Sequence, residues 1–275
     1  TAVNRSAAPA AVRRALDRLA GRDAELPAAL EDDGRRAALV AVLAASSALT
    51  RLLENDTDAV AVLDDLDRQV AIDHSDATAL AATKERALLR IAARDLTGLD
   101  DLTATGASLA ALARDVLHGA WVLAGEPSLA VIGMGKLGGD ELNYSSDIDV
   151  MFVGDGDVGR LARPAAEIMR IAGGCFRVDA NLRPEGRNGP LVRTLASFEA
   201  YWERWAEPWE FQALLKARPA AGPAELSQAF LTASQERLWS HPLGVDDLRQ
   251  IRAMKSRTEQ EVARQGLSER ELKRA

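Results

Sequence analysis

Apolar residues recur at helical spacing in the first part of this chain and form short strand-like runs in the second part. This change of pattern divides the sequence into two regions. Up to about residue 122 apolar positions recur at helical spacing among Ala, Leu, Arg, Asp and Glu, and Gly and Pro are sparse inside the runs. Two such runs cover residues 39–53 and 88–96, and a third follows Asp100 and Asp101. Stripes of this kind are helix-packing faces, so residues 1–122 are predicted to form an N-terminal helical region.

Short apolar runs bounded by Gly and Pro replace the helical pattern from Leu129 onward. Three of these runs predict strands, at residues 129–132, 147–153 and 176–182. A helix is expected over residues 160–172, and helical patterning returns at Ser197. We therefore predict an α+β protein that is mainly helical. A small mixed sheet occupies residues 123–222, and residues 223–275 begin a C-terminal helical bundle.

The amino-acid composition excludes several classes of function. The 275 residues carry 34 Lys and Arg against 41 Asp and Glu, a net charge of −7, which argues against a protein that coats nucleic acid. Cys175 is the single cysteine, so no disulfide can form within the chain. We find neither a secretory leader nor an apolar run long enough to span a bilayer. These features predict a cytoplasmic protein without a membrane partner.

A glycine-rich stretch at Gly133–Gly139 contains a literal G-x-G-x-x-G and follows a predicted strand. A dinucleotide-binding turn is therefore the first rival interpretation. That fold needs a crossover helix between its strands, in a connection of a dozen residues or more. Here only residues 140–146 separate the last glycine from the next strand. The stretch is instead predicted to be a loop or a single turn between neighbouring antiparallel or mixed strands.

Two aspartates, Asp147 and Asp149, are spaced to share one face of the second strand. Their carboxylates repel each other unless a cation lies between them, and magnesium commonly takes one or two carboxylates together with substrate phosphates. Taken alone, the pair would be read as the solvated edge of a sheet. The order of strand, glycine loop and Asp-x-Asp strand favours metal-dependent nucleotidyl transfer. Asp179, on the third strand, is the candidate that would complete a two-metal site.

Three blocks of sequence resemble the glutamine synthetase adenylyltransferase/adenylyl-removing enzyme family. The first block comprises Gly133-Met-Gly-Lys-Leu-Gly-Gly139, Glu141-Leu-Asn143 and Ser145-Ser-Asp-Ile-Asp149. The second comprises Leu182-Arg-Pro-Glu-Gly-Arg187 and Gly189-Pro-Leu191. The third comprises Tyr201-Trp-Glu-Arg-Trp205 and Pro208-Trp-Glu210. The resemblance covers about residues 85–260, and it implies a nucleotidyltransferase core of the DNA polymerase beta-like superfamily.

Members of that family carry two such units, one that removes AMP from a tyrosine of glutamine synthetase and one that attaches it. Within the first block, the motif residues Gly-Met-Gly, Glu-Leu-Asn and Ser-Ser resemble those of the N-terminal, adenylyl-removing unit. The resemblance therefore implies phosphorolysis, in which phosphate attacks the AMP phosphorus and ADP leaves. Two alternatives stay open: the adenylylating unit, which uses ATP, and a non-catalytic module that binds glutamine synthetase or a PII signalling protein. The C-terminal half of the same polypeptide would be a further partner.

Roles for the side chains follow from the resemblance and from their charge. Asp147, Asp149 and Asp179 would bind magnesium, as two ions. Backbone or hydroxyl groups would cradle phosphate oxygens at Gly138, Gly139 and Ser146. Cations for the diphosphate would be Lys136, Arg183 and Arg187, each of which has the alternative of a surface charge or an ion-pair partner. The aromatic residues between Tyr201 and Phe211 are expected to pack a helix onto the sheet rather than to stack on adenine.

Overall fold

The computed structural model of the chain describes residues 2–22, 30–240 and 244–264. Parts of the expected N-terminal and C-terminal regions, residues 1, 23–29, 241–243 and 265–275, lie outside the described residues. Two compact units make up the chain, Thr1–Gly119 and Ala120–Ala275, and the boundary between them along the sequence falls within one long helix. None of the described helices is both long and apolar enough to cross a membrane.

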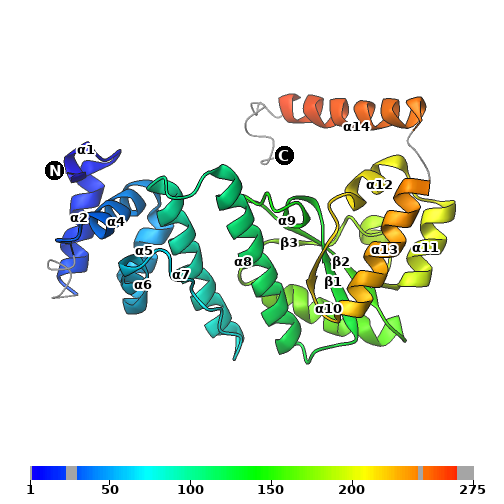
Figure 1. Ribbon diagram of the computed structural model, residues 1–275, viewed down its shortest axis with the longest axis horizontal. Coiled ribbons are helices and arrows are strands. Elements are labelled where there is room, and N and C mark those ends of the chain that lie inside the picture. Colours follow the sequence, from blue (N-terminus) through cyan, green and yellow to red (C-terminus); the bar gives the residue numbers. More distant parts are fainter. Residues whose placement is uncertain (1, 23–29, 241–243, 265–275) are drawn as a thin grey trace. The chain divides into compact units, whose positions relative to one another are not determined.

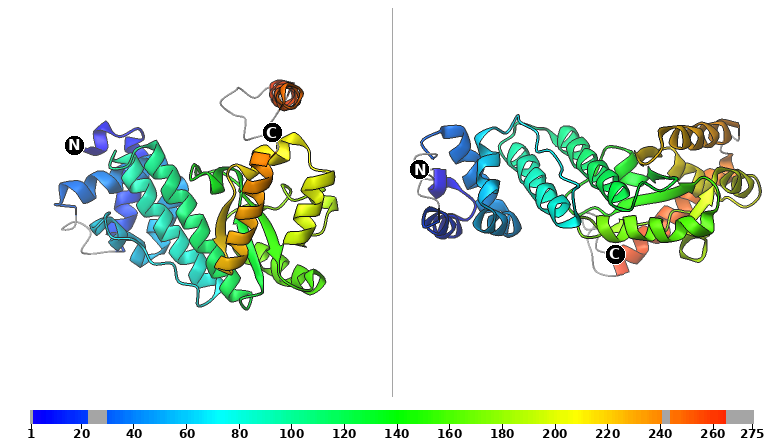
Figure 2. Two further views of the ribbon diagram at one scale, coloured as in Figure 1. Left: turned by 45° about the vertical axis from the view of Figure 1, so that its right-hand side comes forward. Right: turned by 90° about the horizontal axis from the view of Figure 1, so that it is seen from below.

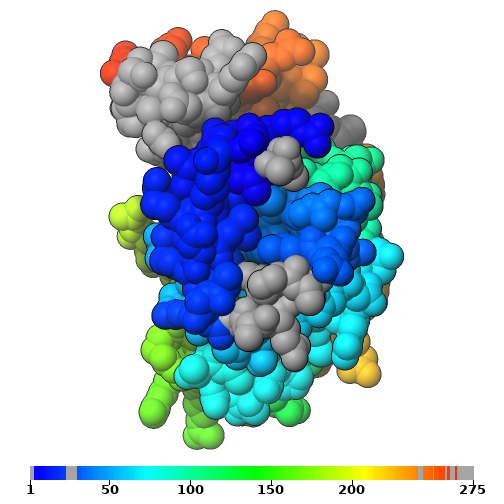
Figure 3. All heavy atoms as spheres, turned by 90° about the vertical axis from the view of Figure 1, so that its left-hand side faces the viewer, coloured from blue at the N-terminus to red at the C-terminus, as the bar shows by residue number. Residues whose placement is uncertain are grey.

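The first unit consists of helices, as the sequence predicts. They are α1 (Ala2–Arg5), α2 (Pro9–Ala20), α4 (Asp33–Ala45), α5 (Ser47–Asn55), α6 (Thr57–Ala61), the 3₁₀ turn η1 (Val62–Asp64), α7 (Ala77–Leu96) and most of α8 (Leu102–Leu123). Several of these helices have a side-chain N-cap. At the start of α7, for example, the Asp76 carboxylate accepts hydrogen bonds from the N–H groups of Thr78 and Ala79. Leucines and valines from α2, α4, α5 and α7 form the core of this unit. Figure 3 shows α2 and α4 on one outer face of it.

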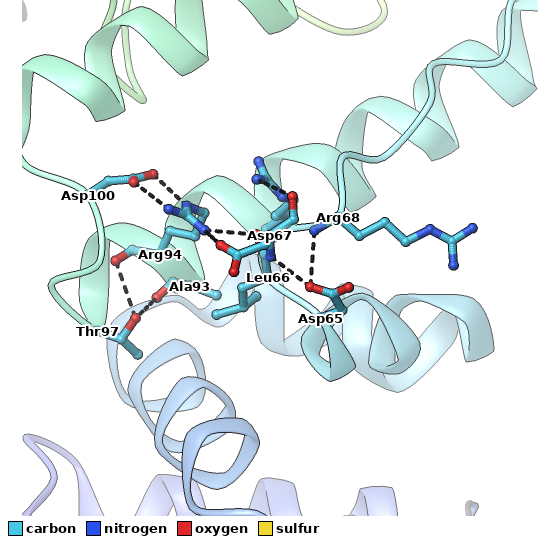
Figure 4. A network of polar contacts seen from close by, with 9 residues as sticks. Asp65, Leu66, Asp67, Arg68, Ala93, Arg94, Thr97 and Asp100 are labelled. Carbon is cyan, nitrogen blue, oxygen red and sulfur yellow. Dashed lines mark hydrogen bonds and ion pairs between the residues drawn. The ribbon is translucent and has the colours of Figure 1, made fainter.

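An arginine at the end of α7 ties a non-helical segment to this unit (Figure 4). Arg94 donates two hydrogen bonds of 2.8 Å to the carboxylate of Asp100. It also donates to Asp67, at 2.5 Å, and to the carbonyl of Leu66, at 3.1 Å. Arg94 and Asp100 are 17% and 14% exposed, so this pair is largely shielded from water. The contacts fix the chain after η1 against the helix that follows it.

The second unit is built on a small mixed sheet (Figure 1). Its described strands are β1 (Leu129–Gly133), β2 (Ile148–Gly154), β3 (Val178–Asp179), β4 (Val192–Thr194) and β5 (Arg218–Ala221). The order across the sheet is β3-β2-β1-β5, and β4 also pairs with β2. β1 runs antiparallel to both β2 and β5, whereas β3 and β4 run parallel to β2. β3 and β4 therefore share the edge of β2 that faces away from β1.

The described helices of this unit are α9 (Gly135–Gly138), α10 (Val158–Ala172), the 3₁₀ turn η2 (Gly186–Asn188), α11 (Leu195–Arg204), α12 (Pro208–Leu214), α13 (Ala224–Ser240) and α14 (Val245–Arg264). Among them, α10 and α13 pack on the sheet. Figure 2 (right) shows α10 and α13 on opposite sides of the strands. Phe198 and Trp202 of α11 and Phe230 of α13 pack against β1 and β2. The expectation that this aromatic region packs onto the sheet is confirmed for Trp202.

The α+β prediction is confirmed, and so are the strands at β1 and β2 and the helix at α10. The connection from β1 to β2, residues 134–147, contains only the single helical turn α9 and joins antiparallel neighbours, which excludes the dinucleotide-binding arrangement. The third strand is much shorter than the predicted 176–182, because only Val178 and Asp179 pair with β2. The sequence analysis missed β4 and β5, and the helix α13 packs on the sheet rather than beginning a separate bundle.

Candidate functional site

Asp149 and Asp179 lie side by side on neighbouring strands. They are register partners in the parallel pairing of β2 with β3, so their side chains leave the same face of the sheet. Each is half-buried. The Asp179 Oδ1 atom accepts a hydrogen bond of 2.7 Å from the backbone N–H of Asn181, which fixes the orientation of that carboxylate. Two carboxylates are thus brought together from sequence positions thirty residues apart.

The turn after β1 lies directly against this pair. The N–H of Met134 donates to the carbonyl of Asp149 at 2.8 Å, and α9 begins at the next residue. Gly135 has a φ of +54°, and a Cβ atom placed on it would lie 2.5 Å from Asp149 Oδ2. The Asp149 carboxylate therefore occupies space that any larger residue at position 135 would take. Glycine is required here both by the backbone angle and by the close approach of the carboxylate.

Asp147 lies just before β2, and its carboxylate is turned to Arg177 rather than to Asp149. The guanidinium of Arg177 forms an ion pair with Asp147 Oδ1, and the N–H of Ile148 donates to the carbonyl of Arg177 at 2.9 Å. The side chains of Arg177 and Asp147 are 72% and 33% exposed. Ion pairs this exposed contribute only about 0–1 kcal/mol, so a divalent cation could outcompete the arginine for Asp147.

The carboxylates of Asp149 and Asp179 suit one hard cation such as magnesium, which would complete its coordination with water and phosphate oxygens. In the described part of the chain, no group of three or more His, Cys, Asp or Glu is placed to hold a metal ion. A third protein ligand at Asp147 would require release from Arg177.

The residues predicted to bind phosphate oxygens, Gly138, Gly139 and Ser146, take part in local packing and hydrogen bonding. A Cβ atom at Gly138 would lie 1.8 Å from the carbonyl oxygen of Lys216 and 2.6 Å from that of Gly133, so this glycine allows α9 to pack closely against the end of β1 and the segment that precedes β5. Gly139 follows directly and is the C-cap of α9. The Ser146 hydroxyl donates to Asn143 Oδ1 at 2.9 Å and is 7% exposed. It thereby closes the turn that leads into Asp147.

The three predicted cations differ in how they are used. Arg183 donates to the carbonyls of Ala180, at 2.6 Å, and Gly189, at 3.3 Å, and so closes the segment between β3 and β4. Burial lowers the pKa of Arg183 from its usual value, which is high enough to leave it charged. The side chains of Lys136, on α9, and Arg187, on η2, form no hydrogen bond or ion pair with any described residue. Those two remain available to a bound anion.

The sequence analysis missed the contacts that brace this region. Asp140 pairs with Arg218, and Glu141 pairs with Lys216, which joins the loop after α9 to the neighbourhood of β5. Neither pairing has a local sequence signal, because the partners are more than seventy positions apart. A cleft of about 540 Å³ lies at the other end of β2, beside Gly154, and none of the predicted site residues lines it.

Comparison with known proteins identifies relatives over most of the described chain. The family whose description is glutamate-ammonia ligase adenylyltransferase matches residues 35–169 and 158–233. A bifunctional glutamine synthetase adenylyltransferase/adenylyl-removing enzyme of Streptomyces coelicolor is 48% identical over 190 residues, which is 60% of this chain and 19% of that protein. Its namesake from Mycobacterium tuberculosis is 56% identical over 137 residues, 50% of this chain and 14% of that protein. The chain thus spans about a fifth or less of the length of these relatives.

Proposed function

The chain belongs to the glutamate-ammonia ligase adenylyltransferase family, and on that premise we propose that it carries a nucleotidyl-transfer site that removes AMP from adenylylated glutamine synthetase. The observation that carries this proposal is the register pairing of Asp149 with Asp179 beside Gly135. The first block of sequence, in its Gly-Met-Gly, Glu-Leu-Asn and Ser-Ser spellings, supports the adenylyl-removing direction over the adenylylating one.

The reaction would be an in-line displacement at the AMP phosphorus. An oxygen of inorganic phosphate forms a bond to that phosphorus, the bond to the tyrosine oxygen breaks, and the electron pair stays on that oxygen, which takes up a proton. ADP and unmodified glutamine synthetase are the products. Because phosphate is itself the nucleophile, the protein's part is mainly positioning and charge stabilisation.

Each residue of the site has a defined task in this scheme. A magnesium ion held by Asp149 and Asp179 would supply Lewis-acid stabilisation of the phosphoryl oxygens. Lys136 and Arg187 would bind the oxygens of the attacking phosphate and of the ADP product, since neither has another partner among the described residues. Gly135 leaves the space that the Asp149 carboxylate occupies, and Asp147 would add a ligand once Arg177 is displaced. Arg183 shapes the segment that presents Arg187.

Turnover of adenylylated glutamine synthetase tests the proposal directly. With magnesium and phosphate, we expect the chain to release ADP, and Asp149→Asn to reduce that rate by at least a hundredfold. Asp155→Asn is the matched control, because Asp155 is exposed just after the far end of the same strand and its side chain forms no hydrogen bond or ion pair with a described residue. Equal rates for Asp149→Asn and the wild type would refute the metal assignment.

Other outcomes separate the competing functions. AMP incorporation from ATP with release of pyrophosphate would reverse the proposed direction. Binding of glutamine synthetase or of a PII protein with no turnover in either direction would favour a non-catalytic module. The PII protein and the C-terminal half of the longer polypeptide stay predictions as partners. The assignment of the core to the DNA polymerase beta-like superfamily stays a prediction as well.

A further inference from the structure

Lys136 is carried by α9, a single helical turn in the connection from β1 to β2. A helix of four residues makes too few backbone hydrogen bonds to persist by itself, so contacts from elsewhere in the fold must hold it. At its N-terminal end, Gly135 lies directly against the Asp149 carboxylate. The contacts at its C-terminal end therefore decide how firmly Lys136 is placed beside Asp149.

The C-terminal end of α9 is closed by backbone hydrogen bonds in the Schellman arrangement. The N–H of Glu141 donates to the carbonyl of Lys136 at 3.0 Å, and the N–H of Asp140 donates to the carbonyl of Leu137 at 3.4 Å. This arrangement requires left-handed backbone just after the helix, and Asp140 has a φ of +54°. Aspartate adopts that conformation less readily than glycine, so contacts with the surrounding structure are needed to stabilise it.

Two cations at the start of β5 supply such contacts. Arg218 forms an ion pair with Asp140, and Lys216 forms one with Glu141. We call these two ion pairs the α9 brace. Arg218 is the first residue of β5 and the register partner of Gly133, the last residue of β1. Strand pairing thus anchors the backbone that carries both cations, and the cations in turn hold the two residues that close α9.

The segment that carries the brace also packs against the end of α9. A Cβ atom at Gly138 would lie 1.8 Å from the carbonyl oxygen of Lys216, and one at Gly139 would lie 3.1 Å from Lys216 Cδ. The Lys216 side chain therefore packs over Gly139, and its ammonium group reaches Glu141 beyond it. Backbone contact and ion pairs thus act on the same end of the turn.

We propose that Lys216 and Arg218 are positioning residues: through the α9 brace they hold Lys136 beside the carboxylates of the proposed magnesium site, in place for nucleotide binding. This role rests on the proposed function, because it concerns the same site. The two cations act through the residues that close α9, so neither of them needs to touch the nucleotide.

Removing both cations tests the brace. The four side chains of the two pairs are between 28% and 52% exposed, so each pair is weak by itself and Lys216→Met/Arg218→Met is the informative variant. In this variant we expect the amides of residues 139–141 to exchange hydrogen about fivefold faster than in the wild type, measured by mass spectrometry on the whole chain. We also expect the dissociation constant of Mg·ADP, measured by calorimetry, to rise about tenfold.

A charge swap separates positioning from direct contact with the nucleotide. Lys216→Glu places two carboxylates together and should weaken Mg·ADP binding, whereas Glu141→Lys/Lys216→Glu restores an ion pair across the same gap. We expect the double variant to regain most of the affinity and of the amide protection that the single variant loses. If Lys216 bound the nucleotide itself, the glutamate would stay harmful in the double variant, and that result would overturn the proposal.

A double-mutant cycle makes the same distinction for Arg218. Asparagine, like aspartate, tolerates left-handed backbone, so Asp140→Asn removes the charge and keeps the turn. If Arg218 acts only through Asp140, then Asp140→Asn/Arg218→Met should bind Mg·ADP no more weakly than Arg218→Met alone. Additive losses would assign Arg218 a direct contact with the nucleotide and would overturn its role as a positioning residue.

Arg170→Met is the matched control for the loss of an exposed ion pair in the same unit. Arg170 donates two hydrogen bonds to Glu167 within α10, and the two side chains are 66% and 42% exposed. We expect this variant to leave both the exchange of residues 139–141 and the Mg·ADP affinity unchanged. Losses as large as those of Lys216→Met/Arg218→Met would show a general effect of charge and would overturn the proposal.

The proposed function and the brace can fail separately. If the wild-type chain does not bind Mg·ADP, the nucleotidyl-transfer site is refuted, and the exchange rates alone then decide whether Lys216 and Arg218 hold the turn. If Mg·ADP binds and the loss of both cations changes neither the exchange rates nor the affinity, the brace is refuted and the site stands.

Discussion

Substituting Gly135 by alanine should damage the site while leaving the fold intact. Gly135 has a φ of +54°, and the new methyl group would lie 2.5 Å from Asp149 Oδ2. Contacts of a Cβ atom below 3.0 Å are essentially never seen, so the carboxylate must retreat by at least 3.0 − 2.5 = 0.5 Å. Displacements of about that size are enough to disable a constellation that must be held in a productive geometry.

The cost to the fold can be separated from the cost to the site. Left-handed backbone costs an alanine about 1–2 kcal/mol, and the reduced entropy of the unfolded chain returns about 0.4–1 kcal/mol. We therefore expect Gly135→Ala to lower the free energy of unfolding by about 1 kcal/mol. Gly156→Ala is the matched control, because its φ is +91° and nothing lies within 4 Å of the added methyl group.

Two measurements decide the outcome. Urea unfolding followed by tryptophan fluorescence should show similar destabilisation in the two variants. Calorimetric titration with Mg·ADP should show at least a tenfold loss of affinity in Gly135→Ala and no loss in Gly156→Ala. The reasoning is wrong if Gly135→Ala binds Mg·ADP as well as the wild type, or if the two variants lose affinity equally.

Three further predictions concern charges outside the Gly135 contact. Lys136→Met should weaken Mg·ADP binding about tenfold. It should change the urea midpoint little, because removing a side chain without a partner usually alters stability by less than about 0.5 kcal/mol. A large loss of stability would show that Lys136 is structural. The hydrogen bonds from Arg94 hold the pKa of Asp100 below its usual 3.8, so its contribution to stability is present above about pH 4 and is lost as the pH falls through the folded value. Asp100→Asn should therefore flatten the acid limb of a stability profile measured by urea titration at pH 3–6, and an unchanged limb would contradict this. Burial raises the pKa of Glu210 above 4.5, so the folded state holds this proton longer and stability falls as the pH rises from about 4.5 through the folded value. Glu210→Gln should remove that decline in the same titration, and persistence of the decline would assign it to another group.

The sequence alone indicated the parts of this protein whose signals are local. Apolar runs bounded by Gly and Pro marked β1 and β2, and the seven-residue connection after Gly139 ruled out a crossover helix. The alternation of side chains along an extended backbone placed Asp149 on a definite face. The specific strings around Asp147 and Arg187 indicated the family. Each of these inferences depends on neighbours within a few residues, which a sequence displays directly.

The tertiary structure decided what depends on pairing between distant segments. β4 and β5 are three and four residues long and exist because β2 and β1 offer them edges, and β5 even contains Pro219, which argues against a strand when read locally. The partner of Asp149 proved to be Asp179, whereas Asp147 turned to Arg177. Periodicity determines which side of a strand a residue occupies, but the choice among partners on that side follows from how the strands align in space.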